Sequence, residues 1–344
     1  MCCIIILSHF EFLGDSQIFG EFYKTYLHNA TLAVDYFFML SGFGIYLSSK
    51  RPECSIKGGL KFAVDKVKKI YPAYICSLLI SIPETMNYFL KYSGIGRSIL
   101  KLLAYLGVDL FLFQSFSGMT KFSHSVNGVC WFLSTLFICY MLCPWILRSV
   151  DNYANKRKVL SMICSFVILT LLLSFCALLI ERNSLGKFDD LWYGHPFIRS
   201  WYLAIGMCVG YLYKESKIRI RSWQELLVAV IVLIYFFGRN SIPFDKGVLR
   251  VFDILLCIIF LYVFACGNGR FSKILRSEKM VELGKISMYL FVFHYPVRML
   301  IGTVFTNNGW ESECMLFFEL FLIILFTSII THFYCVVNNR LKNH

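Results

Sequence analysis

The sequence has little charge. Only 16% of its 344 residues are Asp, Glu, Lys or Arg, whereas soluble domains carry about 25%. Apolar bulk takes the place of charge, with 58% hydrophobic and 17% aromatic residues and a mean hydropathy of +0.64. This composition excludes a soluble globular domain. It predicts an all-α fold, a polytopic bundle of transmembrane helices.

Acidic residues are the scarcer sign of charge, 21 against 34 basic residues, so the formal net charge is +13. A basic chain can bind nucleic acid, but here lysine and arginine lie in short loops between apolar segments. Membrane topology explains that distribution better. We expect no nucleic-acid partner.

Paired cysteine spacing is also lacking. The 14 cysteines lie mostly inside apolar segments, where cysteine behaves as a small hydrophobic residue. No spacing suggests a zinc site, and few of the cysteines would face an oxidising compartment. We therefore expect neither a disulfide framework nor a metal site.

Ten segments are apolar and close to the ~20 residues that a membrane-crossing helix needs. They cover residues 1–14, 30–49, 70–90, 130–148, 159–180, 198–213, 223–240, 250–266, 284–303 and 314–336. We expect one membrane domain over residues 1–344, with about ten transmembrane helices and no soluble domain.

Basic residues gather in segments that ten spans would place on one side: 50–69, 148–158, 214–221, 267–283 and the tail from residue 340. Lysine and arginine resist transfer across the bilayer, so both termini are expected in the cytoplasm. Leu100–Phe116 is also apolar but contains Lys101 and Asp109. We expect a re-entrant or interfacial helix there, because an eleventh span would disturb this alternation.

The first apolar segment has no basic residue before it and ends before Asp15. It is shorter than a full span and lacks the positive start of a signal peptide. A truncated start is one explanation of both features.

Ionisable residues inside a span are costly and are functional candidates. His9 would lie roughly 12 Å deep if Met1 marks the boundary, and histidine suits proton transfer near neutral pH. A hydrogen-bonded packing role is equally open. His294 precedes Pro296, which frees a carbonyl one turn earlier. His294 could line a cavity at a broken helix, but we favour a kink that it stabilises by bonding that carbonyl.

Three further positions carry weaker signals. Asp35 lies at the outer end of the second span, where solvent could satisfy it, so its signal is weak. Ser41 stands beside Gly42 and Gly44; it could be a nucleophile, but small residues also let helices pack closely, which we favour. Trp131 opens the fourth span, where an interfacial tryptophan is expected.

Lys66 and Lys69 bracket the inner entry of the third span. They serve topology alone, or they neutralise the phosphates of a cofactor. The remaining loop histidines are assigned no role: His28, His124 and His195.

Five blocks, in order and at fitting spacing, resemble acyltransferase family 3, integral-membrane enzymes that O-acylate bacterial surface polysaccharides and other acceptors. The blocks are Leu7–His9, Val34–Phe43, Lys66–Pro72, Trp131–Ser134 and Leu283–His294. The resemblance implies ten spans and transfer of an acyl group to a hydroxyl, commonly acetyl from acetyl-CoA. Succinyl or longer acyl groups stay open.

The resemblance makes His9 the essential histidine of the first span, and Asp35 and His294 complete the catalytic candidates. Lys66 and Lys69 stand where the family usually has arginines. The candidates for binding acyl-CoA, a co-substrate rather than a permanently bound cofactor, are Lys66, Lys69 and Tyr71. Those for binding the acceptor are Ser41, Trp131 and Ser134.

The expected partners are acyl-CoA, the lipid bilayer and a polysaccharide or lipid-linked sugar, in a bacterial cytoplasmic (inner) membrane. The oligomeric state is open. The chain departs from the family pattern in three ways. The arginine expected about eleven residues before His9 would precede Met1, so the start is truncated or the chain impaired. Lysine at 66 and 69 loses the bidentate fork of arginine, and the Trp131 block lacks the glutamate of many relatives.

Two alternatives remain. A transporter or flippase for a lipid-linked sugar would use the basic inner loop and His294, although internal repeats, frequent in transporters, are absent. A scaffold subunit without activity is the other alternative. Transfer of label from acetyl-CoA to surface glycan separates the enzyme from the transporter.

Overall fold

The computed structural model describes residues 2–28, 30–48, 50–153, 155–183, 191, 193–243 and 246–342, and all structural statements refer to these. The structure is 81% helical, and its described residues form no strand. The one extended pairing in the described ranges is an isolated bridge between Ile220 and Gly267. The expected all-α fold is confirmed.

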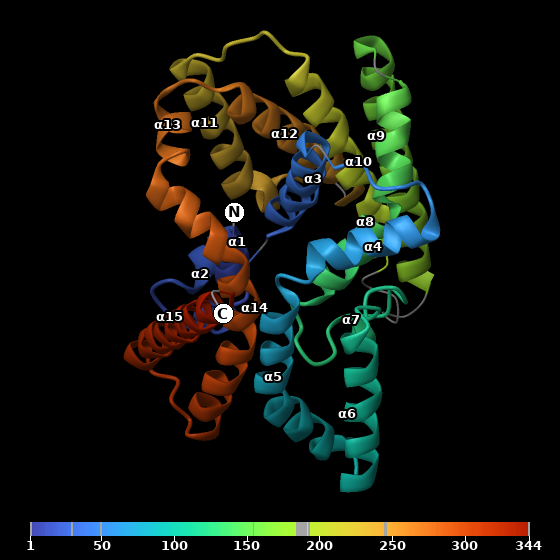
Figure 1. Ribbon diagram of the computed structural model, residues 1–344. Helices are drawn as coiled ribbons and strands as arrows, with labels where there is room; N and C mark the ends of the chain where they lie inside the picture. The colour runs from blue at the N-terminus through green and yellow to red at the C-terminus, as the bar shows by residue number, and fades with distance from the viewer. Residues whose placement is uncertain are drawn as a thin grey trace.

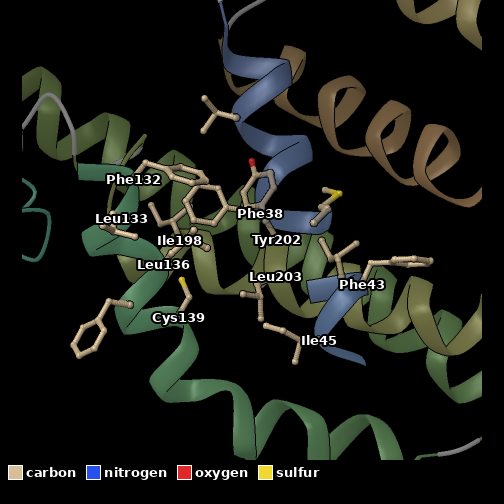
Figure 2. Packing of buried hydrophobic residues seen from close by; sticks show 14 of the residues in the cluster. Phe38, Phe43, Ile45, Phe132, Leu133, Leu136, Cys139, Ile198, Tyr202 and Leu203 are labelled. Carbon is tan, nitrogen blue, oxygen red and sulfur yellow. The ribbon is translucent and has the colours of Figure 1, made fainter. Parts of the chain in front are cut away.

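Helices α3 (Thr31–Leu47) and α10 (Pro196–Lys214) form the centre of the bundle, flanked by α8 (Trp131–Asn152) and α12 (Lys246–Cys266). The rings of Phe38 and Phe132 pack 4.8 Å apart between these helices (Figure 2). Small residues let α3 and α10 pack closely.

A Cβ atom on Gly42 would overlap the carbonyl oxygen of Leu203, and one on Gly206 would overlap that of Met39. The two glycines therefore let the backbones of α3 and α10 touch, as expected for small residues at a membrane helix crossing. Gly44, in contrast, has open space around it.

The basic stretch 50–69, expected to be a loop, contains helix α4 (Ile56–Val67). The Ser55 side chain caps it by accepting the Gly58 N–H at 3.0 Å. Its apolar face, with Phe62 and Val67 buried, packs along α8. The helix forms because apolar residues recur at helical spacing between the lysines, a pattern that the charge of the stretch conceals.

Helices α5 (Tyr71–Tyr92) and α6 (Ile95–Leu110) form a pair that extends away from the rest of the chain (Figure 1). α5 also packs against α14 (Glu278–Asn307), and α14 packs against α15 (Glu313–Lys342). Asp109, at the end of α6, is buried and accepts a hydrogen bond from Ser125 at 2.7 Å. Burial raises the pKa of this carboxyl to about 7.

The outer elements are α9 (Lys156–Asn183), α11 (Ser222–Gly238) and α13 (Arg270–Leu275). Shorter helices are α1 (Cys2–Ser8), α2 (Gly20–Phe22) and α7 (Thr120–Ser123). α1 packs against α14 and α3, which places the start of the chain beside the His294 segment.

Seven stretches in the described residues are long and apolar enough to cross a membrane. They are Gly20–Leu47, Trp131–Asn152, Lys156–Asn183, Ser222–Ser241, Val248–Cys266, Glu278–Asn307 and Glu313–Asn338. Seven of the ten expected spans correspond to these stretches. The expected spans at 70–90 and 198–213 are the helices α5 and α10, which are not among the seven. The first expected span is only the seven-residue α1 followed by a 3-10 turn, Glu11–Asp15.

Gly42→Ala is expected to destabilise the protein, because the added methyl must push apart two backbones. Overpacking of this kind costs about 1–3 kcal/mol, which lowers the melting temperature of the detergent-solubilised protein by several degrees. Gly44→Ala is the matched control; it should leave the melting temperature unchanged or raise it. Equal effects of the two substitutions would contradict the described crossing.

Candidate functional site

A cavity of about 640 Å³ lies where α1, α3, α8 and α14 meet. Aromatic side chains, among them Trp131, Phe132 and Phe291, form its apolar wall. Its ionisable lining comes from segments far apart in the sequence: His9, Glu11, Lys24, His28, His124 and Arg239. Such a mixture of apolar walls and a few polar groups is typical of ligand sites.

His9 enters this cavity because α1 ends at Ser8. The Ser8 hydroxyl bonds the Ile5 carbonyl at 2.8 Å, and the Tyr23 hydroxyl donates to the Ser8 carbonyl at 2.9 Å. His9 follows at once, with its ring centroid 5.5 Å from that of His294 and 5.7 Å from that of Tyr295. The structure thus brings together two of the three catalytic candidates.

His294 is fully buried within α14. Its Nδ1 lies 2.6 Å from the Phe291 carbonyl oxygen. A carbonyl only accepts, so Nδ1 carries the hydrogen and Nε2 is left as an acceptor. Nε2 is buried and has no hydrogen-bond partner among the described residues. A ring nitrogen that can still accept, next to the cavity-lining His9, suits a group that exchanges a proton.

The helix α14 continues through Pro296. Proline cannot bond the Val292 carbonyl, four residues earlier, and the Asn127 side chain donates to that oxygen at 3.1 Å instead. The favoured interpretation, that His294 stabilises a kink by bonding this carbonyl, is therefore wrong. His294 bonds Phe291, and Asn127 satisfies the freed group.

An ion pair that the sequence interpretation missed lies close to His9. Arg298 lies one turn beyond His294 and meets Glu11 at 3.5 Å, and its guanidinium lies 5.9 Å from the centre of the Tyr295 ring. Arg298 falls inside the expected span 284–303, so the rule that intramembrane charges are functional candidates would have found it. The pair ties the segment after His9 to α14.

Asp35 lies outside the cavity, although its neighbours Val34 and Phe37 line it. Its carboxylate is fully buried and accepts a hydrogen bond from Arg199 Nη1. Arg199 also donates to the Tyr193 carbonyl at 2.5 Å, and its guanidinium lies 4.9 Å from the Tyr202 ring centre. The surroundings of Asp35 are those of a buried structural ion pair rather than of an exposed carboxylate.

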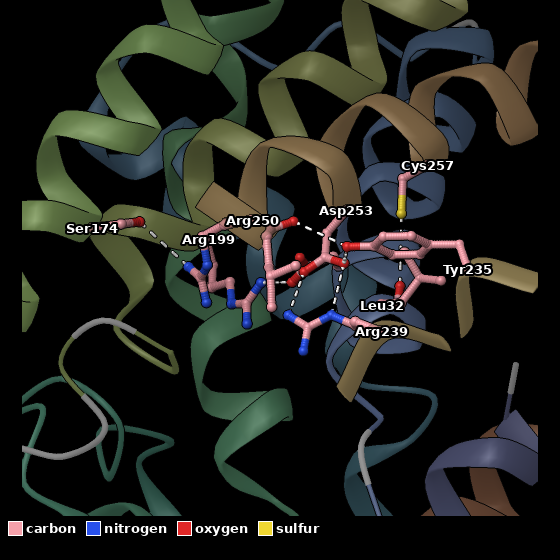
Figure 3. Close-up of polar contacts among 10 residues, drawn as sticks. Leu32, Ser174, Arg199, Tyr235, Arg239, Arg250, Asp253 and Cys257 are labelled. Atoms are coloured by element: carbon pink, nitrogen blue, oxygen red, sulfur yellow. Dashed lines mark hydrogen bonds and ion pairs between the residues drawn. The ribbon is translucent and has the colours of Figure 1, made fainter. Parts of the chain in front are cut away.

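A second buried carboxylate fixes a cavity residue (Figure 3). Arg239, which lines the cavity, donates to both oxygens of Asp253 at 3.0 and 2.7 Å. The Tyr235 hydroxyl donates to the same carboxylate at 2.8 Å. This bidentate pair holds Arg239 in one orientation at the cavity wall.

A smaller pocket of about 210 Å³ carries the expected lysines. Lys66 and Lys69 line it together with Lys285, from the start of α14, and it shares Met288 with the main cavity. Partial burial lowers the pKa of Lys66. Tyr71, the third candidate for acyl-CoA, is absent from this lining; its hydroxyl donates to the Leu110 carbonyl at 2.7 Å.

Of the three candidates for binding the acceptor, one lines the main cavity and two do not. Trp131 lines the main cavity. Ser134 is buried behind it and donates to the Leu112 carbonyl at 2.7 Å. Ser41 donates to the Phe37 carbonyl at 2.8 Å, within its own helix. Only the tryptophan of the three thus borders the cavity.

Two histidines that were given no role, His28 and His124, face the main cavity with His9. A single loop histidine gives no sequence signal, because only the fold brings it to a site. In the described part of the chain, no group of three His, Cys, Asp or Glu side chains could hold a metal ion. The arrangement offers imidazoles for proton transfer beside an apolar cavity and a cationic pocket.

Asp35→Asn is expected to destabilise the protein by about 3–5 kcal/mol, because it leaves the Arg199 charge buried without its partner. Replacing both members, Asp35→Leu with Arg199→Met, recovers much of the loss. Thermal unfolding of the three proteins in detergent measures this. An Asp35→Asn protein that is as stable as wild type but inactive would instead place Asp35 in catalysis.

Comparison with known proteins identifies the family. A family model described as acyltransferase domain matches residues 1–337, almost the entire chain. No curated protein and no solved structure matches it. The five sequence blocks and this match agree: the chain belongs to the acyltransferase domain family, the acyltransferase family 3 that its motifs resemble.

Proposed function

We propose that this membrane acyltransferase moves an acyl group, acetyl in the simplest case, from acyl-CoA to a hydroxyl of a cell-surface polysaccharide or its lipid-linked precursor. The observation that carries the proposal is His9, which lines a 640 Å³ cavity and is backed by the buried His294, with ring centroids 5.5 Å apart. Met288 lines both this cavity and the lysine-lined pocket. We place the enzyme in a bacterial cytoplasmic membrane, with the lysine-lined pocket toward the cytoplasm.

The donor binds first through its phosphates. Lys66, Lys69 and Lys285 bring three ammonium groups to one pocket, although Lys285 also pairs with Glu282 at 2.7 Å. Lysine is a common phosphate ligand. His294 lies nine positions after Lys285 on α14, which is about 13.5 Å along the helix axis. An extended pantetheine arm spans a distance of this order, so the thioester reaches the cavity while the phosphates stay on the lysines.

His9 then acts as the general base. It takes the proton of the acceptor hydroxyl as the oxygen attacks the thioester carbonyl; the C–O bond forms, the C–S bond breaks, and His9 returns the proton to the CoA thiolate. In this proposal His294 Nε2, which has no partner among the described residues, accepts the other ring hydrogen of His9 during the reaction; the two ring centroids are 5.5 Å apart. That hydrogen bond would keep the second His9 nitrogen basic toward the cavity.

His9→Ala is expected to lower kcat for acyl transfer by about 10²–10⁴-fold, the usual contribution of a general base. Purified protein in nanodiscs, labelled acetyl-CoA and a glycan acceptor measure the transfer. His332→Ala is the matched control, because His332 is exposed on α15 and lines none of the three cavities. Transfer that survives His9→Ala would remove His9 from catalysis, and binding of sugar without any acyl transfer would favour the transporter.

Lys66→Gln and Lys69→Gln are expected to raise KM for acetyl-CoA several-fold with little change in kcat, since they remove charge from the donor phosphates. Lys68→Gln is the control on the same segment: Lys68 is exposed, pairs with Asp65 at 2.6 Å and lies outside the pocket. The wild-type KM should also rise with salt. An equal effect at all three lysines would argue for a diffuse surface charge rather than a built site.

A further inference from the structure

A second cavity, of about 320 Å³, lies between α5, α6, α7 and the outer half of α14. It is half the size of the main cavity, which holds His9. None of the candidate residues from the sequence lines it.

The aromatic wall of this cavity is built by the α5–α6 pair. Phe89 and Tyr105 stack with ring centroids 5.5 Å apart and an angle of 19° between their planes. Tyr88, the residue before Phe89, lines the same space and is 58% exposed. The partly exposed ring of Tyr88, with its hydroxyl group, suits a ligand that has both an apolar face and many polar edges.

Hydrogen-bonding groups stand opposite these rings. Glu84 and Lys121 line the cavity, and within the described residues neither takes part in a salt bridge or a side-chain hydrogen bond. The Thr120 hydroxyl, also in the lining, is buried without a partner in the same part of the chain. A carboxylate, an ammonium and a hydroxyl offer both acceptors and donors, which is what several neighbouring hydroxyls require.

The cavity meets the reaction site at two residues. His124 lines both cavities, and Tyr295 lines the second cavity while its ring stands 5.7 Å from that of His9. Gly128 leaves room for Tyr295: a Cβ atom there would lie 2.8 Å from the tyrosine hydroxyl. A ligand in the second cavity is therefore separated from His9, the proposed general base, by one side chain.

We propose that the second cavity is a specificity subsite that binds the sugar next to the one being acylated. The inference rests on the proposed function. The reacting sugar lies at His9 in the main cavity, and its neighbour stacks on Tyr88 and bonds Glu84. The enzyme then reads two adjoining sugars, so a disaccharide is the smallest good acceptor.

The test compares methyl glycosides of neutral hexoses and N-acetylhexosamines with the disaccharides built from them, as acceptors of label from acetyl-CoA. Wild-type protein in nanodiscs should use the best disaccharide with a kcat/KM at least about tenfold above that of its monosaccharide. Glu84→Gln and Tyr88→Ala should abolish this advantage and leave the monosaccharide rate unchanged, because they remove contacts to the second ring alone.

Tyr92→Ala is the matched control. The Tyr92 ring meets that of Tyr88 edge to face, one turn along α5, with centroids 5.3 Å apart. Tyr92 lies outside the cavity and is 74% exposed, so its loss should keep the disaccharide advantage. The slow hydrolysis of acetyl-CoA in the absence of acceptor is measured as well. It should be equal in wild type and in the three variants. Equal use of both acceptors by wild type, or an advantage that survives Glu84→Gln and Tyr88→Ala, would overturn the subsite and leave the acyltransferase intact. Absence of both hydrolysis and transfer in wild type would overturn the two proposals together.

Discussion

The hydrocarbon of a bilayer offers no hydrogen-bond partner, so every polar group inside the bundle must find one in the protein. Most of the described interior follows from this constraint. Arg199 meets Asp35, and the carbonyl freed by Pro296 meets Asn127. These contacts join α3 to α10 and α14 to the segment before α8. The polar interior is therefore what holds the helices in register, over an apolar core that would tolerate sliding.

The same constraint makes exceptions informative. His294 Nε2 is buried and has no partner among the described residues, while its other nitrogen is fixed on Phe291. His9 stands beside it at the end of a short helix, held by Tyr23 and by the Glu11–Arg298 pair. On the proposed function, this pair of imidazoles next to the main cavity carries the proton transfer. The lysine-lined pocket and the aromatic second cavity adjoin it through Met288 and His124.

Much of the fold follows from the sequence, because long apolar segments can only be helices in a membrane. The expected spans at 130–148, 159–180 and 314–336 are α8, α9 and α15, each extended by a few residues. Helix α4 was missed because its lysines dominate the stretch, and α1 is shorter than a span because the chain turns at His9. The family also follows from the order of five short blocks.

The site was harder to foresee. His9 and His294 were found because charge inside a span is costly, and the structure brings them together. The partner of Asp35 could not be found, since Arg199 lies 164 positions away and its pairing depends on how α3 crosses α10. The cavity roles of His28, His124 and Lys285 also depend on packing between distant helices, of which a single sequence carries no sign.

The most direct measurement is a structure of the full chain in nanodiscs with a non-hydrolysable acetyl-CoA analogue in which a methylene replaces the thioester sulfur. The account predicts the phosphates against Lys66, Lys69 and Lys285, with the acetyl carbonyl in the main cavity beside His9. An analogue bound elsewhere, or one whose acetyl group ends far from His9, would contradict it.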